Sequence, residues 1–255
     1  MLFQIIITLF AYMSLFFVLA LWKKNFTLVD IGWGLGFIII AIISYLHYPL
    51  FLKNTLLLVV VSAWGLRLSY YLFLRTIGKK EDDRYTQLRK RWGESANKIA
   101  YFRIFMLQGA LMFIVSLPIP FGMMQQSGEM YFYNWIGLII WCLGWMLEVV
   151  SDFHLNRFKS KKENMGKICT SGPWKLCRFP NYFGEILLWY GIYILSLGKQ
   201  SWWTIIGPIS INLFILKVSG VSLLEKKYKK NAEYLSYSEK IPRLIPFTKP
   251  KKLAK

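Results

Sequence analysis

Long apolar runs constrain this chain more than any other feature of its sequence. They are about 17 to 25 residues long, the length of helix that crosses roughly 30 Å of hydrocarbon. Apolar residues make up 55% of the chain, and they gather in these runs. We therefore predict an all-α integral membrane protein with about seven transmembrane helices. The expected spans are residues 2–22, 31–48, 50–74, 104–124, 132–153, 184–198 and 201–223, of which the second and the sixth are shorter than the others.

The distribution of Lys and Arg predicts how these helices are oriented. The chain contains 32 Lys and Arg and 13 Asp and Glu, which gives a net charge of +19. The basic residues concentrate at 23–24, in 75–103, in 154–183 and after residue 224, and the other loops contain only Lys53 and Lys199. Because loops rich in Lys and Arg stay in the cytoplasm, we expect an N-terminus outside and a cytoplasmic C-terminus.

The same residues bear on partners and localisation. Basic loops beside a membrane contact anionic lipid, and cations split among several loops make a poor nucleic-acid site, so we expect membrane lipids and no nucleic acid as partners. The expected location is the inner membrane of a bacterium or the endoplasmic reticulum of a eukaryote. Cys142 lies in a predicted helix and Cys169 and Cys177 in a predicted cytoplasmic loop, which favours free thiols. His47 and His154 are far apart in the chain, so no metal site is expected.

Polar residues inside the apolar spans are candidates for function, because ionisable groups at membrane depth are costly. In "TLVDIGWGLGF", residues 27–37, Asp30 opens the second span. A functional carboxylate is one interpretation, and a helix cap followed by glycines for close packing is the other. In the third span, Arg67 and Tyr71 are four residues apart and share a helix face. A buried arginine needs a carboxylate or a ligand phosphate, whereas the "EDDRY" that follows is also compatible with a solvated loop of charge pairs.

The end of the fifth predicted span carries a polar stripe. Glu148, Asp152, Asn156 and Lys159 follow at i, i+4, i+8 and i+11, which places them on one helix face. Packing alone does not require two carboxylates within the bilayer, so we predict a site for a polar ligand. Carboxylates and the amide would bind hydroxyls or an amide of that ligand, and cations would bind its phosphates.

The stretch "SGPWKLCRFPNYFGEILLWYGIYILSL", residues 171–197, is expected to form the other half of this site. Its glycine and prolines prevent a regular helix, so we predict a loop with free backbone amides before the next span. Asn181 and Glu185 share a face as that span begins. A membrane-surface loop with an aromatic belt is the alternative, but it does not account for that pair. The other candidates are the cations Lys175 and Arg178 and the rings Trp174, Phe179 and Tyr182.

The chain after residue 223 is expected to be more than a disordered basic tail. A folded segment packed at the cytoplasmic mouth is predicted by Tyr234, Tyr237, Pro242, Arg243, Pro246 and Phe247. Together, the polar residues of the last spans and loops suit a large anionic cofactor that binds from the cytosol. An apolar substrate would then arrive from the bilayer.

These stretches resemble a family of membrane proteins related to steroid 5α-reductases. "TSGPWKLCRFPNYFGEILLWYG" is similar to the signature Thr-Gly-Leu-Trp-Arg-Tyr-Ser-Arg-His-Pro-Asn-Tyr-Phe-Gly-Glu, and "VDIGWG", "RLSYYLFLR", "EDDRY", "EVVSDFHLNRFK" and "RLIPF" also match. The resemblance implies seven transmembrane helices and the reduction, with NADPH, of a carbon–carbon double bond conjugated to a ketone. It further implies that the cofactor contacts Glu148, Asp152, Lys159, Asn181 and Glu185. The chemistry of the remaining candidates adds Arg67, Trp174, Arg178 and Tyr182 to the expected cofactor site.

The resemblance leaves the proton donor open. The steroid enzymes polarise the ketone with a Glu/Tyr pair in their first helices. Here Asp30 lies in the comparable region and Trp64 stands at the tyrosine position, so Asp30 and Tyr71 are the candidates for the catalytic acid. We expect one membrane domain over residues 1–255, with helices of 1–103 on the substrate side and 104–255 carrying the cofactor site.

Two other functions remain open. Isoprenylcysteine and phospholipid methyltransferases, which use S-adenosylmethionine, share an Arg-His-Pro block and a Glu-containing tail. In this chain Phe179 stands at the His position, and Glu225 is followed by Lys226 rather than by a second Glu. A non-catalytic lipid-binding protein is the second alternative. The lipophilic substrate itself, steroid-like or another unsaturated lipid, is not specified by these residues.

Overall fold

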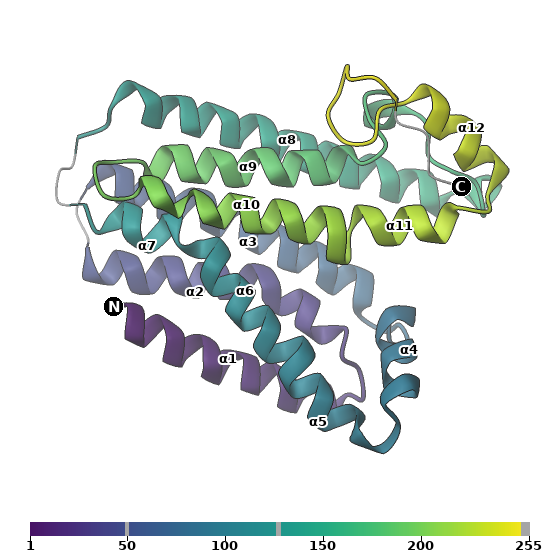
Figure 1. Cartoon of the computed structure of the whole chain (residues 1–255), viewed down its shortest axis with the longest axis horizontal. Coiled ribbons are helices and arrows are strands. Elements are labelled where there is room, and N and C mark those ends of the chain that lie inside the picture. Colours follow the sequence, from purple (N-terminus) through teal and green to yellow (C-terminus); the bar gives the residue numbers. More distant parts are fainter. Residues whose placement is uncertain (49–50, 126–128, 251–255) are drawn as a thin grey trace. The chain divides into compact units, whose positions relative to one another are not determined.

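A computed structural model describes residues 1–48, 51–125 and 129–250, and their regular secondary structure is entirely helical (Figure 1). In these ranges, six helical stretches are long and apolar enough to cross a membrane: α1 (Leu2–Trp22), α2 (Leu28–His47), α3 (Leu52–Thr76), Asp83–Met123, α8 (Phe132–Ser160) and Trp202–Tyr228. The all-α membrane prediction is therefore confirmed. The sixth predicted span corresponds to α9 (Pro180–Ser196), which has 17 residues and is too short to count among the six. Seven crossings and their orientation stay predictions.

The basic 75–103 segment is more regular than a loop. Two helices, α4 (Asp83–Trp92) and α5 (Ala96–Ala100), flank a short 3₁₀ turn, and a π-helical turn leads into α6 (Leu107–Ser116) and α7 (Pro118–Met123). The Asp82 carboxylate accepts a hydrogen bond from the Arg84 backbone N–H at 2.9 Å, which caps the start of α4. Arg, Lys and Gln are good helix formers, so a charged segment forms a helix once it is capped.

The chain clusters into two compact units, each described by itself. The first comprises Met1–Asn134 with Leu195–Gly207 and the second Trp135–Ile194 with Pro208–Lys255. The prediction of one domain, with its two functional parts, stays a prediction. Residue 50 of the predicted third span and residues 251–255 of the predicted tail lie outside the described residues.

In the first unit, α2 and α3 pack with their backbones in contact. A Cβ atom added to Gly34 would lie 2.3 Å from the Gly65 carbonyl oxygen, and one added to Gly65 would lie 2.6 Å from that of Gly34. The Tyr12 hydroxyl of α1 donates a 2.7 Å hydrogen bond to the carbonyl of Gly32. Close packing accounts for the glycines that alternate in the second span.

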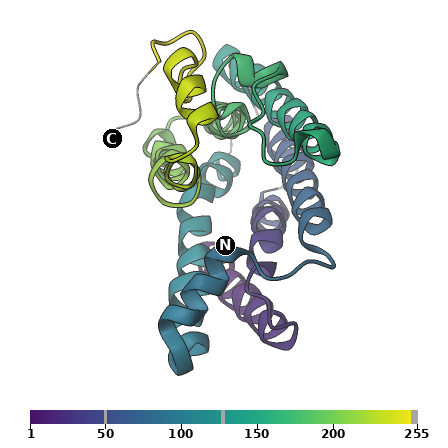
Figure 2. The ribbon, with the colours of Figure 1, turned by 90° about the vertical axis from the view of Figure 1, so that its right-hand side faces the viewer.

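In the second unit, α8 and α9 lie side by side, followed by α10 (Ile206–Leu213), α11 (Val221–Tyr228) and α12 (Ala232–Lys240) (Figure 1). Figure 2 shows α12 next to the loop that joins α8 to α9. In this contact, Trp174 of the loop is buried in one apolar cluster with Tyr234 and Tyr237 of α12. The prediction that the tail is folded is therefore confirmed for α12 and Ile241, whereas Phe247 is 92% exposed, and the place of the tail at a cytoplasmic mouth stays a prediction.

Candidate functional site

Two buried carboxylates lie on α8 in the second unit. Glu148 is 3% exposed and Asp152 is 6% exposed, one helical turn apart on the same face. The side-chain amide of Asn181, at the start of α9, donates a hydrogen bond to Asp152 Oδ1 over 3.3 Å. The polar stripe of α8 and the Asn181 end of α9 therefore meet.

Glycines allow this meeting. A Cβ on Gly184 would lie 2.6 Å from the Gly144 carbonyl oxygen and 2.7 Å from the backbone nitrogen of Glu148, and a Cβ on Gly144 would lie 2.6 Å from the nitrogen of Leu188. Farther along α9, a Cβ on Gly191 would lie 2.5 Å from the nitrogen of Trp141. Larger residues at these positions would separate the two helices and move α9 away from the carboxylates.

The loop before α9 is fixed against α8 by a histidine. Gly172 has a φ of +59°, and a Cβ there would lie 2.7–2.9 Å from ring atoms of His154. His154 Nε2 also hydrogen-bonds the Ser171 hydroxyl at 2.9 Å, and its ring stacks on Trp174 with centroids 6.1 Å apart. Trp174 is buried, so its ring serves packing between the loop, α8 and α12. Sequence reasoning gave His154 no role beyond excluding a metal site.

Arg178 lies inside the second unit rather than at its surface. Its side chain is 1% exposed, and Nη1 lies 3.1 Å from Glu225 Oε1 in α11. The other oxygen of Glu225 lies 2.7 Å from Arg243 Nη2. Lys159 and Lys175 are exposed, so they fit the expected cation that binds a ligand directly better than Arg178 does. Glu225 and Arg243 were not among the predicted site residues, although Glu225 is the one acid in the basic stretch 223–230.

The remaining predicted residues of this unit surround the start of α9. Tyr182 and Glu185 are half-buried, and the Tyr182 ring stacks on Phe179 with centroids 6.0 Å apart. Tyr182 also lies against Gly220, where a Cβ would be 3.1 Å from its ring. Close packing of this ring therefore brings the segment before α11 to the start of α9.

Several groups around the loop are held in their neutral forms. Burial raises the pKa of the Cys177 thiol to about 11 and that of the Tyr234 hydroxyl to about 12. Burial also raises the pKa of Tyr237, whose hydroxyl donates a 2.6 Å hydrogen bond to the Trp174 carbonyl. At neutral pH these groups are uncharged, and Tyr237 acts as a hydrogen-bond donor. Among the described residues, no group of three His, Cys, Asp or Glu side chains could hold a metal ion.

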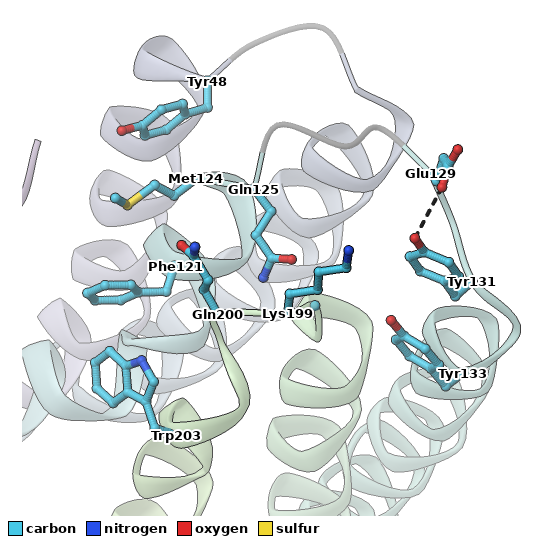
Figure 3. Close-up of a pocket in the computed structure, with 11 residues that line it drawn as sticks. Tyr48, Phe121, Met124, Gln125, Glu129, Tyr131, Tyr133, Lys199, Gln200 and Trp203 are labelled. Atoms are coloured by element: carbon cyan, nitrogen blue, oxygen red, sulfur yellow. Dashed lines mark hydrogen bonds between the residues drawn. The ribbon is translucent and has the colours of Figure 1, made fainter.

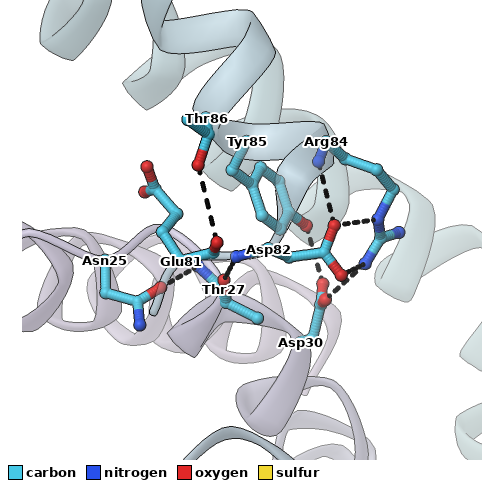
Figure 4. A network of polar contacts seen from close by, with 8 residues as sticks. All are labelled: Asn25, Thr27, Asp30, Glu81, Asp82, Arg84, Tyr85 and Thr86. Atoms are coloured by element: carbon cyan, nitrogen blue, oxygen red, sulfur yellow. Dashed lines mark hydrogen bonds and ion pairs between the residues drawn. The ribbon is translucent and has the colours of Figure 1, made fainter. Parts of the chain in front are cut away.

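In the first unit, Asp30 belongs to a polar network with the "EDDRY" segment (Figure 4). Its two oxygens accept hydrogen bonds from the Tyr85 hydroxyl at 2.7 Å and from Arg84 Nη2 at 3.0 Å. Arg84 also pairs with Asp82, whose backbone N–H donates to the Thr27 hydroxyl. Asp30 makes no cap hydrogen bond, since the cap position of α2 is Thr27, and the segment 81–85 is fixed to the start of that helix.

The other predicted residues of the first unit lie on α3. Arg67 and Tyr71 are half-buried, and the guanidinium carbon lies 5.5 Å from the centre of the tyrosine ring. This separation is within the range of a cation–π contact. Asp30, Arg67 and Tyr71 thus belong to one unit, whereas the predicted residues from Glu148 to Glu185 belong to the other.

A cavity of about 1170 Å³ opens in the first unit (Figure 3). Rings and a thioether form one side, the Tyr131–Glu129 pair lies on another, and Lys199 lies between them. The predicted site residues are not among those that line it. Its full lining is Tyr48, Phe121, Met124, Gln125, Glu129, Tyr131, Tyr133, Gly198, Lys199, Gln200 and Trp203.

Comparisons with known proteins agree with the resemblance in part. A family described as "Protein of unknown function (DUF1295)" matches residues 16–241. A steroid 5-alpha-reductase, DET2 of Gossypium hirsutum, is 31% identical over 72 residues, a stretch that covers 28% of this chain and 28% of that protein. No solved structure matches the chain. These similarities point to a reductase-like family of membrane proteins.

Proposed function

The chain belongs to the DUF1295 family, and from that premise we propose that it is a membrane oxidoreductase that reduces an activated C=C bond of a lipophilic substrate with NADPH. The observation that carries this proposal is the pair of buried carboxylates on α8 that faces the amide of Asn181. Partial similarity to a steroid 5-alpha-reductase supports the reaction class. The proposal specifies the substrate only by class, as a steroid-like or other unsaturated lipid.

The residues of the second unit fit the polar groups of NADPH. Its ribose hydroxyls and carboxamide can donate to Glu148 and Asp152, and the half-buried Glu185 adds a third carboxylate. Its phosphates require cations, which Lys159 and Lys175 provide on exposed side chains at the end of α8 and in the loop before α9. NADPH would supply the hydride, and the protein would supply orientation and charge.

Each residue then has a defined task. Asp152 orients Asn181 through their hydrogen bond. The carboxylates of α8 would accept hydrogen bonds from ligand hydroxyls. The closely packed α8 and α9 keep water from the carboxylates, which strengthens every hydrogen bond made there. The acid that protonates the reduced substrate stays a prediction. Asp30 accepts hydrogen bonds from both Arg84 and Tyr85, so Tyr71 is the better proton donor of the two candidates.

Cofactor binding by the purified protein tests the proposal. Nicotinamide fluorescence in detergent should reveal saturable NADPH binding, and Asn181→Ala or Asp152→Asn should weaken it by about tenfold or more, as expected when a charge-assisted hydrogen bond is lost. Cys142→Ala is the matched control, because Cys142 is exposed on the same helix and should leave the affinity unchanged.

Two results would contradict the proposal. Binding of S-adenosylmethionine without NADPH would indicate the methyltransferase alternative. Absence of binding to either cofactor would indicate a lipid-binding protein without this chemistry. If NADPH binds, lipids that copurify with the protein, identified by native mass spectrometry, would narrow the substrate class.

A further inference from the structure

The loop of residues 171–179 in the second unit contacts the C-terminal part of the chain at three separate points. Two are hydrogen bonds of the loop backbone: the Arg178 N–H donates to the Pro242 carbonyl at 2.9 Å, and the Trp174 carbonyl accepts from Tyr237 at 2.6 Å. The third is the ion pair of Arg178 with Glu225. Two positions of one short loop, Trp174 and Arg178, are thus held by residues far along the chain.

The ion pair is a buried one that Glu225 shares between two arginines. Its carboxylate has one oxygen 3.1 Å from Arg178 and the other 2.7 Å from Arg243, and the three side chains are 10%, 1% and 36% exposed, respectively. Loss of the carboxylate would leave the guanidinium of Arg178 buried without this counter-charge, which is costly in a medium of low dielectric constant. Glu225 therefore stabilises the burial of Arg178 inside the unit.

The loop has little regular structure with which to hold its shape. Its regular structure is one 3₁₀ turn, Gly172–Lys175, which contains a glycine with positive φ and a proline. A second proline, Pro180, follows the loop at the start of α9. The loop leads directly into α9 at Pro180, next to Asn181. The position of the loop therefore decides how α9 begins.

We propose that Glu225 is a positioning residue for the cofactor site: through Arg178 and Arg243 it fixes the 171–179 loop to the C-terminal segment and so sets the place of Asn181. The consequence of this inference, tighter cofactor binding, rests on the proposed function. A loop that is already ordered need not lose conformational entropy when the ligand binds. The C-terminal segment thus acts on the ligand without touching it.

Glu225→Gln tests the inference by two measurements. The first is hydrogen exchange of the peptide that contains residues 171–179, which should become faster by about tenfold or more. Without the pair of Glu225 with Arg243, the Pro242 carbonyl that accepts from the Arg178 N–H is held less firmly. The second is NADPH affinity, which should fall by about tenfold or more. Glu225→Asp keeps the charge and should recover part of both effects. Glu163→Gln is the control, since it removes the same group from an exposed ion pair with Lys161.

The outcomes separate this inference from the proposed function. Wild-type protein that binds no NADPH contradicts the proposed function, while the exchange measurement still tests the loop. Unchanged exchange in Glu225→Gln would overturn the inference, and so would faster exchange with unchanged NADPH affinity, which would mean a purely structural role. If Glu225→Gln does not fold, Arg243→Gln replaces it, because that variant keeps the Arg178–Glu225 pair. A smaller rise in exchange is then expected, and no rise would count against the inference.

Discussion

The contact between α8 and α9 gives a sharp prediction for Gly184→Ala. The new Cβ would lie 2.6 Å from the Gly144 carbonyl oxygen, 2.7 Å from the Glu148 nitrogen and 3.1 Å from the Glu148 Cα. Non-bonded heavy atoms settle at about 3.5 to 4.0 Å, so the helices must separate by about 1 Å. All three atoms belong to the backbone, and no side chain can rotate to relieve the contact. The change therefore acts on the helix positions themselves.

Separation of the helices should lower both the stability of the protein and its affinity for NADPH. Overpacking costs about 1–3 kcal/mol, and the better helix propensity of alanine offsets up to about 1 kcal/mol of it. A net loss of about 1–2 kcal/mol would lower the melting temperature by roughly 2–8 °C for a chain of this size. The Asn181–Asp152 hydrogen bond, already 3.3 Å long, would not survive a further separation of about 1 Å.

Thermal unfolding in detergent, followed by tryptophan fluorescence, measures the first effect, and NADPH affinity measures the second. Cys142→Ala provides the control, since it places an alanine on the exposed side of α8 and should change stability by less than about 0.5 kcal/mol. A Gly184→Ala protein that melts at or above the wild-type temperature and binds NADPH normally would refute the close contact.

Three further predictions concern single groups. Tyr237→Phe removes the donor to the Trp174 carbonyl and should cost about 1–3 kcal/mol of unfolding free energy, measured by thermal melts; an unchanged melt would contradict the buried hydrogen bond. Because burial raises the Cys177 pKa to about 11, the folded state holds this proton more tightly. Stability should therefore fall with rising pH between about 8.5 and 11, a slope that Cys177→Ala should reduce. Burial raises the pKa of Asp82, but hydrogen bonds from Arg84 outweigh this effect and leave the pKa below its ordinary value. Its stabilisation should be complete above about pH 4 and disappear below it, so Asp82→Asn should show a weaker acid dependence in melts at about pH 3 to 5.

The long helices were predictable because their signals are local. An apolar run of sufficient length predicts a spanning helix wherever it occurs, and the expected 2–22 and 31–48 agree with α1 and α2 within a few residues. The spacing of Glu148 and Asp152 likewise placed them on one face through helical periodicity alone. The helices of 83–100 do not follow from the charge of this segment, which is equally typical of a loop; they form because the Asp82 cap and helix-forming side chains act together.

The partners of the polar residues were not predictable from those local patterns. Asp30 pairs with Arg84, 54 residues away, and Arg178 of the loop pairs with Glu225 of α11. From the sequence, Asp30 is expected to be either a catalytic acid or a helix cap, and Arg178 to contact a cofactor. A charged side chain shows that it needs a counter-charge, but several acids in the sequence could provide it. His154 is similar, since only the fold brings its ring against Gly172.

By itself, then, the sequence determined the long apolar helices, the polar face of α8 and the resemblance to a reductase-like family, because run length, periodicity and motifs are local properties of the chain. The tertiary structure decided which charges pair with one another and which stay exposed: Arg178 inside the second unit, Lys159 and Lys175 at its surface. The reason is physical. Burial makes an ion pair strong only between groups that the fold brings within about 4 Å, and only the tertiary structure brings the loop that carries Arg178 to Glu225 of α11.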